Sequence, residues 1–302
     1  MSTLLKVKEP GLLLTIQDLG RSGYQHLGVP ISGVMDRYAL VTGNLLLGNN
    51  RNAAALEITL GGTELTFLKE TVVCLTGADL APHVDRKGVP MWETFKVKEG
   101  QTLVLERPVQ GVRSYLCVSG GVQSEQWLGS QSVFERGSMG KRLSQGDFVN
   151  QNESGDQPSF GSTLRRDLRP VYTKDVKLRV IPSYQESCFE EESVAYFYES
   201  TYTFKKGDRM GCMLEGEEPL KHRGTADIVS DAVTFGTIQV PSNGQPMVLL
   251  ADSQTTGGYT TVGTVVSVDH WKLAQLIPGS KVNFTRLPLE EAEDLLSEWK
   301  EV

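Results

Sequence analysis

The sequence predicts a mainly β protein of two lobes with a few short helices. Short runs rich in β-branched and aromatic residues recur along the 302 residues, turn-forming residues bound these runs, and amphipathic helical patterns are few. The length suits one large domain or two ordinary ones. Short strands at this spacing are typical of barrels and sandwiches.

Several runs have the composition of strands and lie between turn-forming residues. They are residues 64–68, 71–75, 102–105, 114–118, 177–181, 196–202, 236–240 and 247–250. Helices are expected in three places. The first begins after Asp36, whose carboxylate can cap its first turn, and ends at Gly48. The second follows Asp269, and the third is acidic and amphipathic and covers residues 289–299.

A polar, turn-rich segment at residues 150–159 is the best linker candidate. A cut after this segment divides the chain into lobes 1–160 and 161–302. The basic segment 165–170 that follows is interpreted as a solvated surface.

An internal echo indicates that the two lobes are related. An acid, a Gly-Tyr pair, a glycine and an acid that opens a helix occur in this order within residues 18–36 and again within 252–269. We interpret the echo as an ancient duplication that gives two similar β-barrels. The duplication requires Tyr24 and Tyr259 to lie on equivalent elements.

The composition excludes several classes of protein. The formal net charge of −7 argues against binding to nucleic acid or to an anionic membrane surface. The N-terminus has no signal-peptide pattern, and no apolar run approaches the ~20 residues that span a bilayer. The cysteines form no CxxC pair and the histidines lack ligand spacing, so free thiols and no metal are expected. Together these features favour a cytoplasmic location.

A glycine-rich loop at residues 15–36 gathers polar groups ahead of a helix N-terminus. Its glycines, which free the backbone to approach a ligand closely, are Gly20, Gly23, Gly28 and Gly33. The polar residues among them are Asp18, Arg21, Tyr24 and Gln25. Such a loop can hold a carboxylate or a phosphate. The alternative is a structural loop in which Asp18 pairs with Arg21 and the glycines only turn the chain.

A second polar loop follows the strand predicted at 247–250. Its candidate residues are Asp252, Gln254, Thr255, Thr256, Gly257, Gly258 and Tyr259. Adjacent hydroxyls and glycine amides can form a nest of donors for an anion or an amide carbonyl. A purely structural loop is an equal alternative. Gln239, in a predicted strand, is either a satisfied core amide or a substrate contact.

The order and spacing of several motifs resemble the family known as allophanate hydrolase subunit 2. The motifs are residues 15–25, 28–30, 32–36, 77–80, 208–211, 238–241, 244–246 and 254–259. The family includes the C subunit of bacterial 5-oxoprolinase, an antagonist of a histidine-kinase inhibitor, and part of the carboxyltransferase region of urea carboxylase. The resemblance implies two cyclophilin-like β-barrel lobes and a KipI-like sister, the B subunit.

The resemblance also implies an activity. A protein like the 5-oxoprolinase C subunit works with the B subunit and a third, the A subunit, to open the lactam of 5-oxoproline to glutamate, driven by ATP, and is inactive alone. The sequence has no GxxxxGK[ST] loop, so ATP is assigned to the assembled complex. The alternatives are a regulatory antagonist of the kinase inhibitor and the carboxyltransferase half of a biotin-dependent urea or amide carboxylase. No biotin-accepting Ala-Met-Lys-Met segment occurs, so a biotin role requires another protein to carry that group.

Site roles follow from this hypothesis. Arg21 and the donors of residues 255–258 suit a carboxylate or developing phosphate charge, and Asp18 or Asp252 orients donors or acts as a base. The candidates for substrate binding are Tyr24, Gln25, Gln239, Gln254, Thr255, Thr256, Gly257, Gly258 and Tyr259. Residues 181–185 depart from the family pattern, which has a Gly-Pro pair there. If this segment contacts a ligand, the choice of substrate differs.

Overall fold

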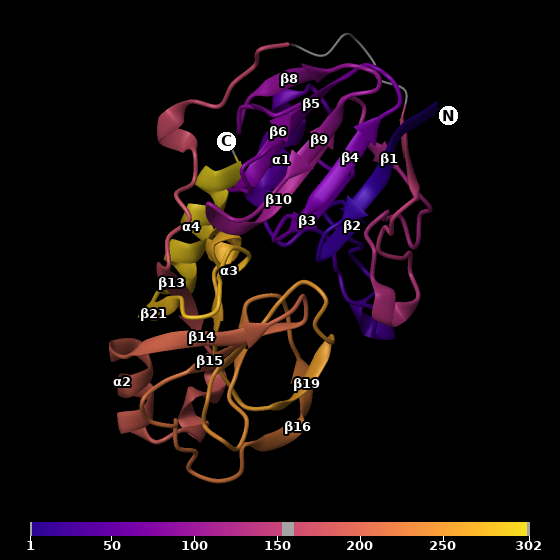
Figure 1. The fold of residues 1–302 in the computed structure, drawn as a ribbon. Helices are drawn as coiled ribbons and strands as arrows, with labels where there is room; N and C mark the ends of the chain where they lie inside the picture. The colour runs from indigo at the N-terminus through magenta and orange to yellow at the C-terminus, as the bar shows by residue number, and fades with distance from the viewer. Residues whose placement is uncertain (1, 153–159, 301–302) are drawn as a thin grey trace. The chain divides into compact units, whose positions relative to one another are not determined.

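The computed structural model describes residues 2–152 and 160–300 and confirms the prediction of a mainly β protein with few helices (Figure 1). Most of the expected linker, residues 153–159, lies outside the described residues. Its beginning is not a linker, because Asn150 and Gln151 end strand β12 (Phe148–Gln151) and pair with the N-terminal strand.

The chain forms two compact units, residues 1–22 with 32–172 and residues 23–31 with 173–302. The predicted boundary near residue 160 therefore lies too early, because the segment 161–172 belongs to the first unit. Three hydrogen bonds within that unit join it to distant residues: Thr94 N to the Ser162 carbonyl at 2.8 Å, the Tyr38 hydroxyl to the Leu168 carbonyl at 2.7 Å, and the Tyr172 hydroxyl to the Asp36 carboxylate at 3.0 Å. Contacts of this range leave no local pattern in the sequence.

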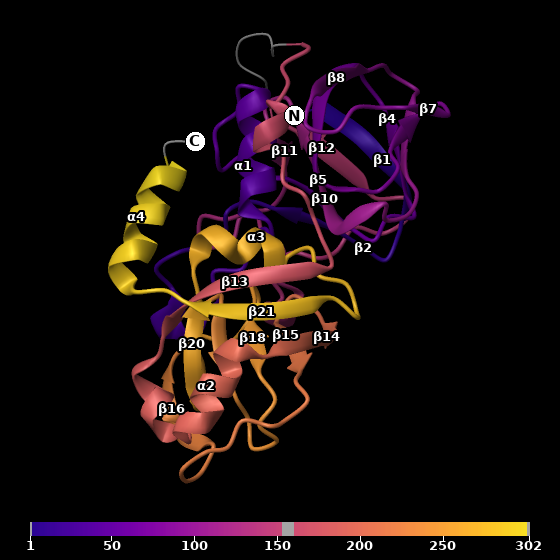
Figure 2. The same ribbon diagram turned by 90° about the vertical axis from the view of Figure 1, so that its left-hand side faces the viewer.

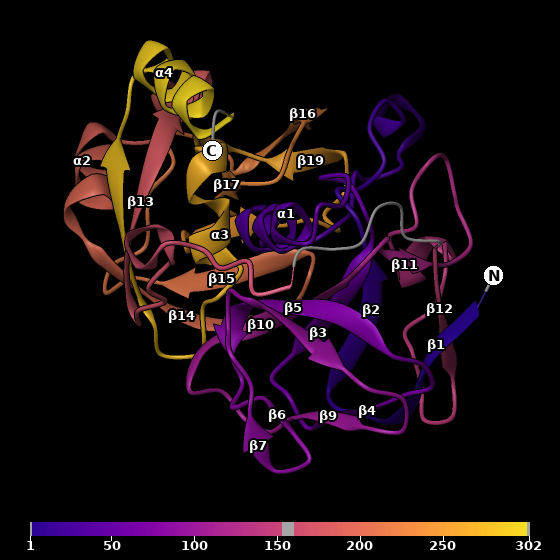
Figure 3. The ribbon, with the colours of Figure 1, turned by 90° about the horizontal axis from the view of Figure 1, so that it is seen from above.

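The first unit consists of two antiparallel sheets around one apolar core. One sheet has the order β11-β12-β1-β4-β9-β6-β7 and the other β2-β3-β10-β5-β8, and Figure 3 shows them as two layers. Besides β12, the strands are β1 (Ser2–Pro10), β2 (Leu13–Gln17), β3 (Ala55–Thr59), β4 (Thr63–Phe67), β5 (Thr71–Asp79), β6 (His83–Val84), β7 (Lys87–Gly88), β8 (Thr94–Val97), β9 (Thr102–Leu105), β10 (Gln110–Val118) and β11 (Val122–Gln123). Alternate residues face the core, as with Leu65 and Phe67 of β4, which are fully buried. Burial of these apolar side chains stabilises the pair of sheets.

Helix α1 (Arg37–Leu46) begins where the sequence predicts. The Asp36 carboxylate accepts a hydrogen bond from the Ala39 amide at 2.9 Å, which caps the first turn. Ala39 and Leu40 are fully buried, and the helix contacts β5 and β10 of its own unit. Gly48, with φ of +70°, follows the end of the helix as expected.

The second unit contains a closed barrel in the order β13-β20-β17-β18-β15-β14-β21. Its strands are β13 (Asp175–Pro182), β14 (Thr201–Gly207), β15 (Gly211–Glu215), β17 (Thr237–Gln239), β18 (Met247–Leu249), β20 (Thr261–Val265) and β21 (Lys281–Arg286). Strands β13 and β21 run parallel, side by side in Figure 2, and the other neighbouring strands of the barrel are antiparallel. Strands β16 (Asp227–Ala232) and β19 (Thr256–Tyr259) form a separate two-stranded sheet. The predicted barrel architecture is confirmed in this unit, whereas the first unit forms two facing sheets.

The strand expected at residues 196–202 is wrong in its first part. Glu191–Glu199 form helix α2, and β14 starts only at Thr201. Acidic residues open the helix, where its dipole favours negative charge. Phe197 is fully buried and stacks on Phe284 of β21 with 4.6 Å between ring centres. The aromatic run suits a strand by propensity, but packing of one helical face against the barrel decides the local structure.

Two further helices agree with the sequence. The helix expected after Asp269 is the short α3 (His270–Leu273), and the C-terminal helix is α4 (Leu289–Lys300). Ala292 of α4 is buried with Val266 and Val268, and two leucines of the predicted apolar side pack against this cluster. In the part of the chain that the structure describes, no helix is long and apolar enough to cross a membrane.

Candidate functional site

Asp18 joins the first glycine-rich loop to a distant segment of the same unit. Its side chain is buried and accepts four hydrogen bonds, from the amides of Gly20 and Gln131 and from the hydroxyls of Ser130 and Ser132, at 2.5 to 2.8 Å. A carboxylate offers about four acceptor positions, so these donors satisfy it. The geometry favours a positioning role for Asp18 over that of a base.

Arg21 contacts the same segment. Its side chain is 1% exposed, and its guanidinium donates to the carbonyls of Trp127 and Ser132. Because Ser132 also donates to Asp18, the two candidate residues meet at one serine and hold residues 127–132 against the loop.

The glycines of this loop have positive φ, as the sequence predicts, with values from +78° to +95°. At Gly33 the reason is close packing: a Cβ atom would lie 2.8 Å from the Gly20 nitrogen and 3.0 Å from the Asp18 carbonyl oxygen. Gln25 belongs to a 3₁₀ turn, and its side chain accepts a hydrogen bond from the Gly23 amide at 3.0 Å. The turn-forming part of the expectation is therefore confirmed.

The duplication inferred from the internal echo is wrong. Tyr24 precedes a 3₁₀ turn, whereas Tyr259 ends strand β19, so the two tyrosines lie on unrelated elements. The two acids also differ. Asp36 caps a helix, but the Asp269 carboxylate makes no capping bond and instead accepts from the Arg179 guanidinium at 2.7 and 2.9 Å. Gly and Asp recur in turns for local reasons, which explains a matching order without common descent.

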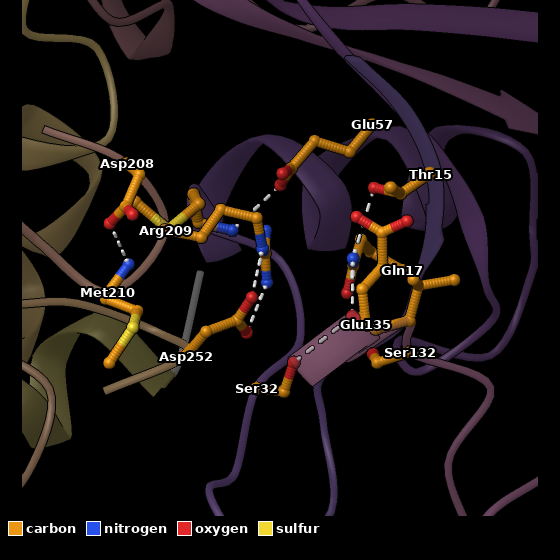
Figure 4. A network of polar contacts seen from close by, with 12 residues as sticks. Thr15, Gln17, Ser32, Glu57, Ser132, Glu135, Asp208, Arg209, Met210 and Asp252 are labelled. Atoms are coloured by element: carbon orange, nitrogen blue, oxygen red, sulfur yellow. Dashed lines mark hydrogen bonds and ion pairs between the residues drawn. The ribbon is translucent and has the colours of Figure 1, made fainter. Parts of the chain in front are cut away.

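In the second unit, Asp252 forms a largely buried ion pair with Arg209. The Arg209 Nε and Nη2 atoms donate to the two carboxylate oxygens at 2.8 and 3.0 Å, as Figure 4 shows. Arg209 lies in the turn between β14 and β15, where the Asp208 carboxylate accepts from the Met210 amide at 2.7 Å. The planar guanidinium matches the carboxylate in this two-pronged geometry. The sequence alone does not indicate this ion pair, because the two residues are 43 positions apart.

The second polar loop is a strand and not a nest of donors. Thr256 and Gly257 of β19 pair with Ala232 and Asp231 of β16. Neither Gly257 nor Gly258 has a positive φ, so their amides do not converge as they do in an anion-binding nest. The expectation of a nest is wrong because sheet pairing holds this backbone extended. Thr256 and Gln254 are exposed, and Thr255 is partly buried.

Gln239 is a buried amide, the first of its two predicted alternatives. It is 1% exposed, its Oε1 accepts from Gln254 Nε2 at 3.4 Å, and its Nε2 donates to the Tyr259 carbonyl at 3.5 Å. A Cβ atom on Gly257 would lie 2.1 Å from Gln239 Nε2. The structure therefore brings together these four predicted residues, and Gln239 leaves no room for a side chain at position 257.

A cavity of about 230 Å³ lies within the second unit. Its walls come from the end of β13 with the 3₁₀ turn Tyr184–Cys188, and from β16, β17, β19 and β20. Two predicted residues, Gly257 and Tyr259, line it together with residues 182–185. The segment that departs from the family pattern thus faces the same space as the second loop.

One carboxylate, that of Asp231, lines this cavity, and no Lys, Arg or His among the described residues does. The Tyr184 hydroxyl and the Gln185 amide donate to one Asp231 oxygen, and the Ala232 amide donates to the other at 2.8 Å. The hydrogen bond from Tyr184 lowers the pKa of Asp231, so the carboxylate is ionised at neutral pH. Gln185 is fixed in turn, because its Oε1 accepts from the amide and hydroxyl of Thr261 at 2.8 and 3.2 Å.

Sequence reasoning missed this cluster. The available signal was the departure at residues 181–185, which marked the right segment without identifying Asp231 as its partner. Within the described ranges, no group of three His, Cys, Asp or Glu side chains is placed to hold a metal ion. The cysteines are free thiols, as expected. Buried His270 has a structural contact, stacking on Phe235 with 4.1 Å between ring centres.

This β architecture is that of a carboxyltransferase domain. The chain belongs to the family described as carboxyltransferase domain, subdomain A and B, whose model matches residues 27–286.

Two curated relatives share nearly their whole length with this chain. One is the C subunit of Haemophilus influenzae 5-oxoprolinase, 37% identical over 288 residues that cover 93% of this chain and 90% of the relative. The other is the C subunit of Escherichia coli K12 5-oxoprolinase, 34% identical over 294 residues that cover 96% and 93%. The crystal structure of Kluyveromyces lactis urea carboxylase superposes with a TM-score of 0.93 at 29% identity. The match covers 99% of this chain but 29% of that one, so this chain spans less than a third of the urea carboxylase.

Proposed function

We propose that this chain is the C subunit of an ATP-dependent 5-oxoprolinase and works in a cytoplasmic complex with a sister B subunit and a third, A subunit. The observation that carries the proposal is the similarity to two proteins named as the C subunit of 5-oxoprolinase. It covers at least 93% of this chain and at least 90% of each relative. The match to urea carboxylase, by contrast, covers only part of that larger enzyme, as expected for a shared module.

The reaction in question opens the lactam of 5-oxoproline. Amide resonance makes the carbonyl carbon a poor electrophile, and hydrolysis of ATP to ADP and phosphate drives the step. Water adds to the carbonyl carbon, the C–N bond breaks, and the nitrogen takes up a proton to give glutamate. The second-unit cavity suits a small polar ring, because hydroxyl and amide groups with one carboxylate surround it.

The candidate residues divide into two roles under this proposal. Asp18 and Arg21 are positioning residues, because their polar atoms bind the 127–132 segment of their own unit. Asp252, oriented by Arg209, is the candidate base or donor-orienting group. Gly257 and Tyr259 contact the substrate from the cavity wall. The remaining proposed contacts are Tyr24, Gln25, Gln254, Thr255, Thr256 and Gly258.

The test is 5-oxoproline-dependent ADP release by this chain mixed with the two proteins proposed as its A and B partners, each omitted in turn. We expect release only from the complete mixture. Asp252→Asn should lower release at unchanged assembly by size-exclusion chromatography. Asp227→Asn, which removes one charge from an exposed strand of the same unit, should leave it unchanged. An intact assembly that releases no ADP on addition of 5-oxoproline would refute the proposal.

Carboxyl transfer is a second candidate, favoured by the TM-score of 0.93 against urea carboxylase. It requires biotin on another protein, because this chain has no Ala-Met-Lys-Met segment. Avidin, which sequesters biotin, separates the two functions. It should abolish ATP turnover by a carboxylase assembly, and leave turnover by a 5-oxoprolinase unchanged.

A further inference from the structure

The cavity of the second unit is polar yet unsuited to an anion. Its lining carries hydroxyl groups, the amide of Gln185 and the ionised carboxylate of Asp231, but no cationic side chain from the described part of the chain. A ligand carboxylate or phosphate in this space would lie near Asp231 without an opposing charge. Two like charges in one small space repel each other, and no cationic side chain of the described lining offsets that repulsion. The cavity therefore selects the neutral or N–H-donating part of a ligand.

The polar groups around the cavity differ in whether they are already satisfied. Asp231 accepts three hydrogen bonds out of about four that a carboxylate can accept. Both ends of the Gln185 amide are in use, toward Thr261 on one side and toward Tyr184 and Asp231 on the other. Gln185 is thus a positioning residue, and one acceptor position of the carboxylate remains for a ligand.

Two hydroxyls of the lining complement this acceptor. Across residues 2–152 and 160–300, the structure gives the side-chain hydroxyls of Tyr259 and Thr264 no hydrogen-bond partner. Tyr259 projects from β19 and Thr264 from β20, which border the same cavity. The lining therefore contains two hydroxyl donors and one carboxylate acceptor.

We infer that this cavity binds the N–H and C=O edge of a small lactam, with Asp231 accepting from the ring N–H and the hydroxyls of Tyr259 and Thr264 donating to the ring carbonyl. A lactam ring holds its N–H and C=O on the same edge, so a site with an acceptor and donors in one small space satisfies both. The volume of about 230 Å³ lies just below the ~300–1,000 Å³ of sites for larger ligands. The choice of a lactam rests on the proposed function; the exclusion of an anion rests on the lining alone. The carboxylate of 5-oxoproline then points away from Asp231.

The test is a ligand-observed NMR titration of the full chain with 2-pyrrolidinone, which has both groups, and with N-methyl-2-pyrrolidinone, which lacks the N–H. We expect the N-methyl compound to bind at least about ten-fold more weakly, because a hydrogen bond to a charged group is lost. Asp231→Asn should weaken 2-pyrrolidinone binding by a similar factor, and Thr264→Val should weaken it less. Asp227→Asn, on the same strand but outside the lining, should bind like the unchanged chain.

The outcomes separate this inference from the proposed function. Equal binding of the two compounds, or Asp231→Asn binding that matches Asp227→Asn, overturns the inference even if the assembled complex hydrolyses 5-oxoproline. Binding that depends on the N–H and on Asp231 supports it even if no 5-oxoproline-dependent ADP release is found. Unchanged thermal unfolding midpoints show that the variants retain their fold. If Asp231→Asn lowers the midpoint, the comparison of 2-pyrrolidinone with N-methyl-2-pyrrolidinone tests the inference instead, because it uses the unaltered chain.

Discussion

Replacing Gly257 by alanine should destabilise the second unit, whereas the same change at the adjacent Gly258 should not. Both glycines lie in β19 and neither has a positive φ, so the backbone accepts alanine at either position. A Cβ atom at Gly257 would lie 2.1 Å from Gln239 Nε2 and 3.3 Å from Val233 Cγ1. At Gly258 the nearest atoms are 3.7 Å away, an ordinary van der Waals distance.

The magnitude follows from what must move. Gln239 is 1% exposed, so its amide has no solvent to swing into, and room must come from its packed neighbours. Overpacking of this kind costs about 1–3 kcal/mol. The lower conformational entropy of alanine in the unfolded chain offsets about 0.4–1 kcal/mol of that cost. We therefore expect Gly257→Ala to lose about 1–2 kcal/mol of unfolding free energy and Gly258→Ala to gain up to ~1 kcal/mol.

Urea denaturation followed by circular dichroism measures both variants, and thermal unfolding should differ by a few degrees, at roughly 2–4 °C per kcal/mol. If the clash with the amide is the cause, Gln239→Ala combined with Gly257→Ala should be less destabilising than the sum of the two single changes. Equal stability of the Gly257 and Gly258 variants would refute the packing argument.

Three other perturbations test the remaining polar and thiol groups. Asp18→Asn should lower the free energy of unfolding by about 2–4 kcal/mol, because an amide N–H then faces one of the four hydrogen-bond donors around Asp18. Asp147→Asn, in a more exposed turn of the same unit, should lower it by less than ~1 kcal/mol. Similar urea midpoints for the two variants would contradict this prediction. Burial alone would raise the pKa of Asp269, but hydrogen bonds from an arginine and a lysine outweigh burial and hold that pKa below its usual value. The resulting stabilisation is present above about pH 4 and is lost as the pH falls further, so Asp269→Asn should flatten the acid limb of the pH–stability curve, and an unaltered limb would count against it. Burial raises the pKa of Cys74 to about 12, so iodoacetamide near neutral pH should modify the partly buried Cys188 first, and peptide mapping that shows the reverse order would oppose the structure.

Local chemistry in the sequence predicted much of the secondary structure. The strand runs at 64–68 and 102–105 correspond to β4 and β9, because alternating apolar side chains suit a half-buried sheet, and the run at 114–118 corresponds to the fully buried end of β10. The cap at Asp36 and the positive φ of the loop glycines were also predictable, since each depends on a residue and its nearest neighbours. Motif order indicated the family, and the match at 27–286 confirmed it.

Only the tertiary structure decided which polar groups act together. Asp18 meets Ser132 across 114 positions, and Asp252 meets Arg209 across 43, and neither distance leaves a periodic trace in the sequence. The cavity around Asp231 likewise depends on the pairing of β16 with β19. The same pairing holds residues 256–259 extended, so the segment whose glycines suggested a nest forms a strand instead. Local propensity selects the elements of this protein, but the pairing of distant strands determines what their polar side chains contact.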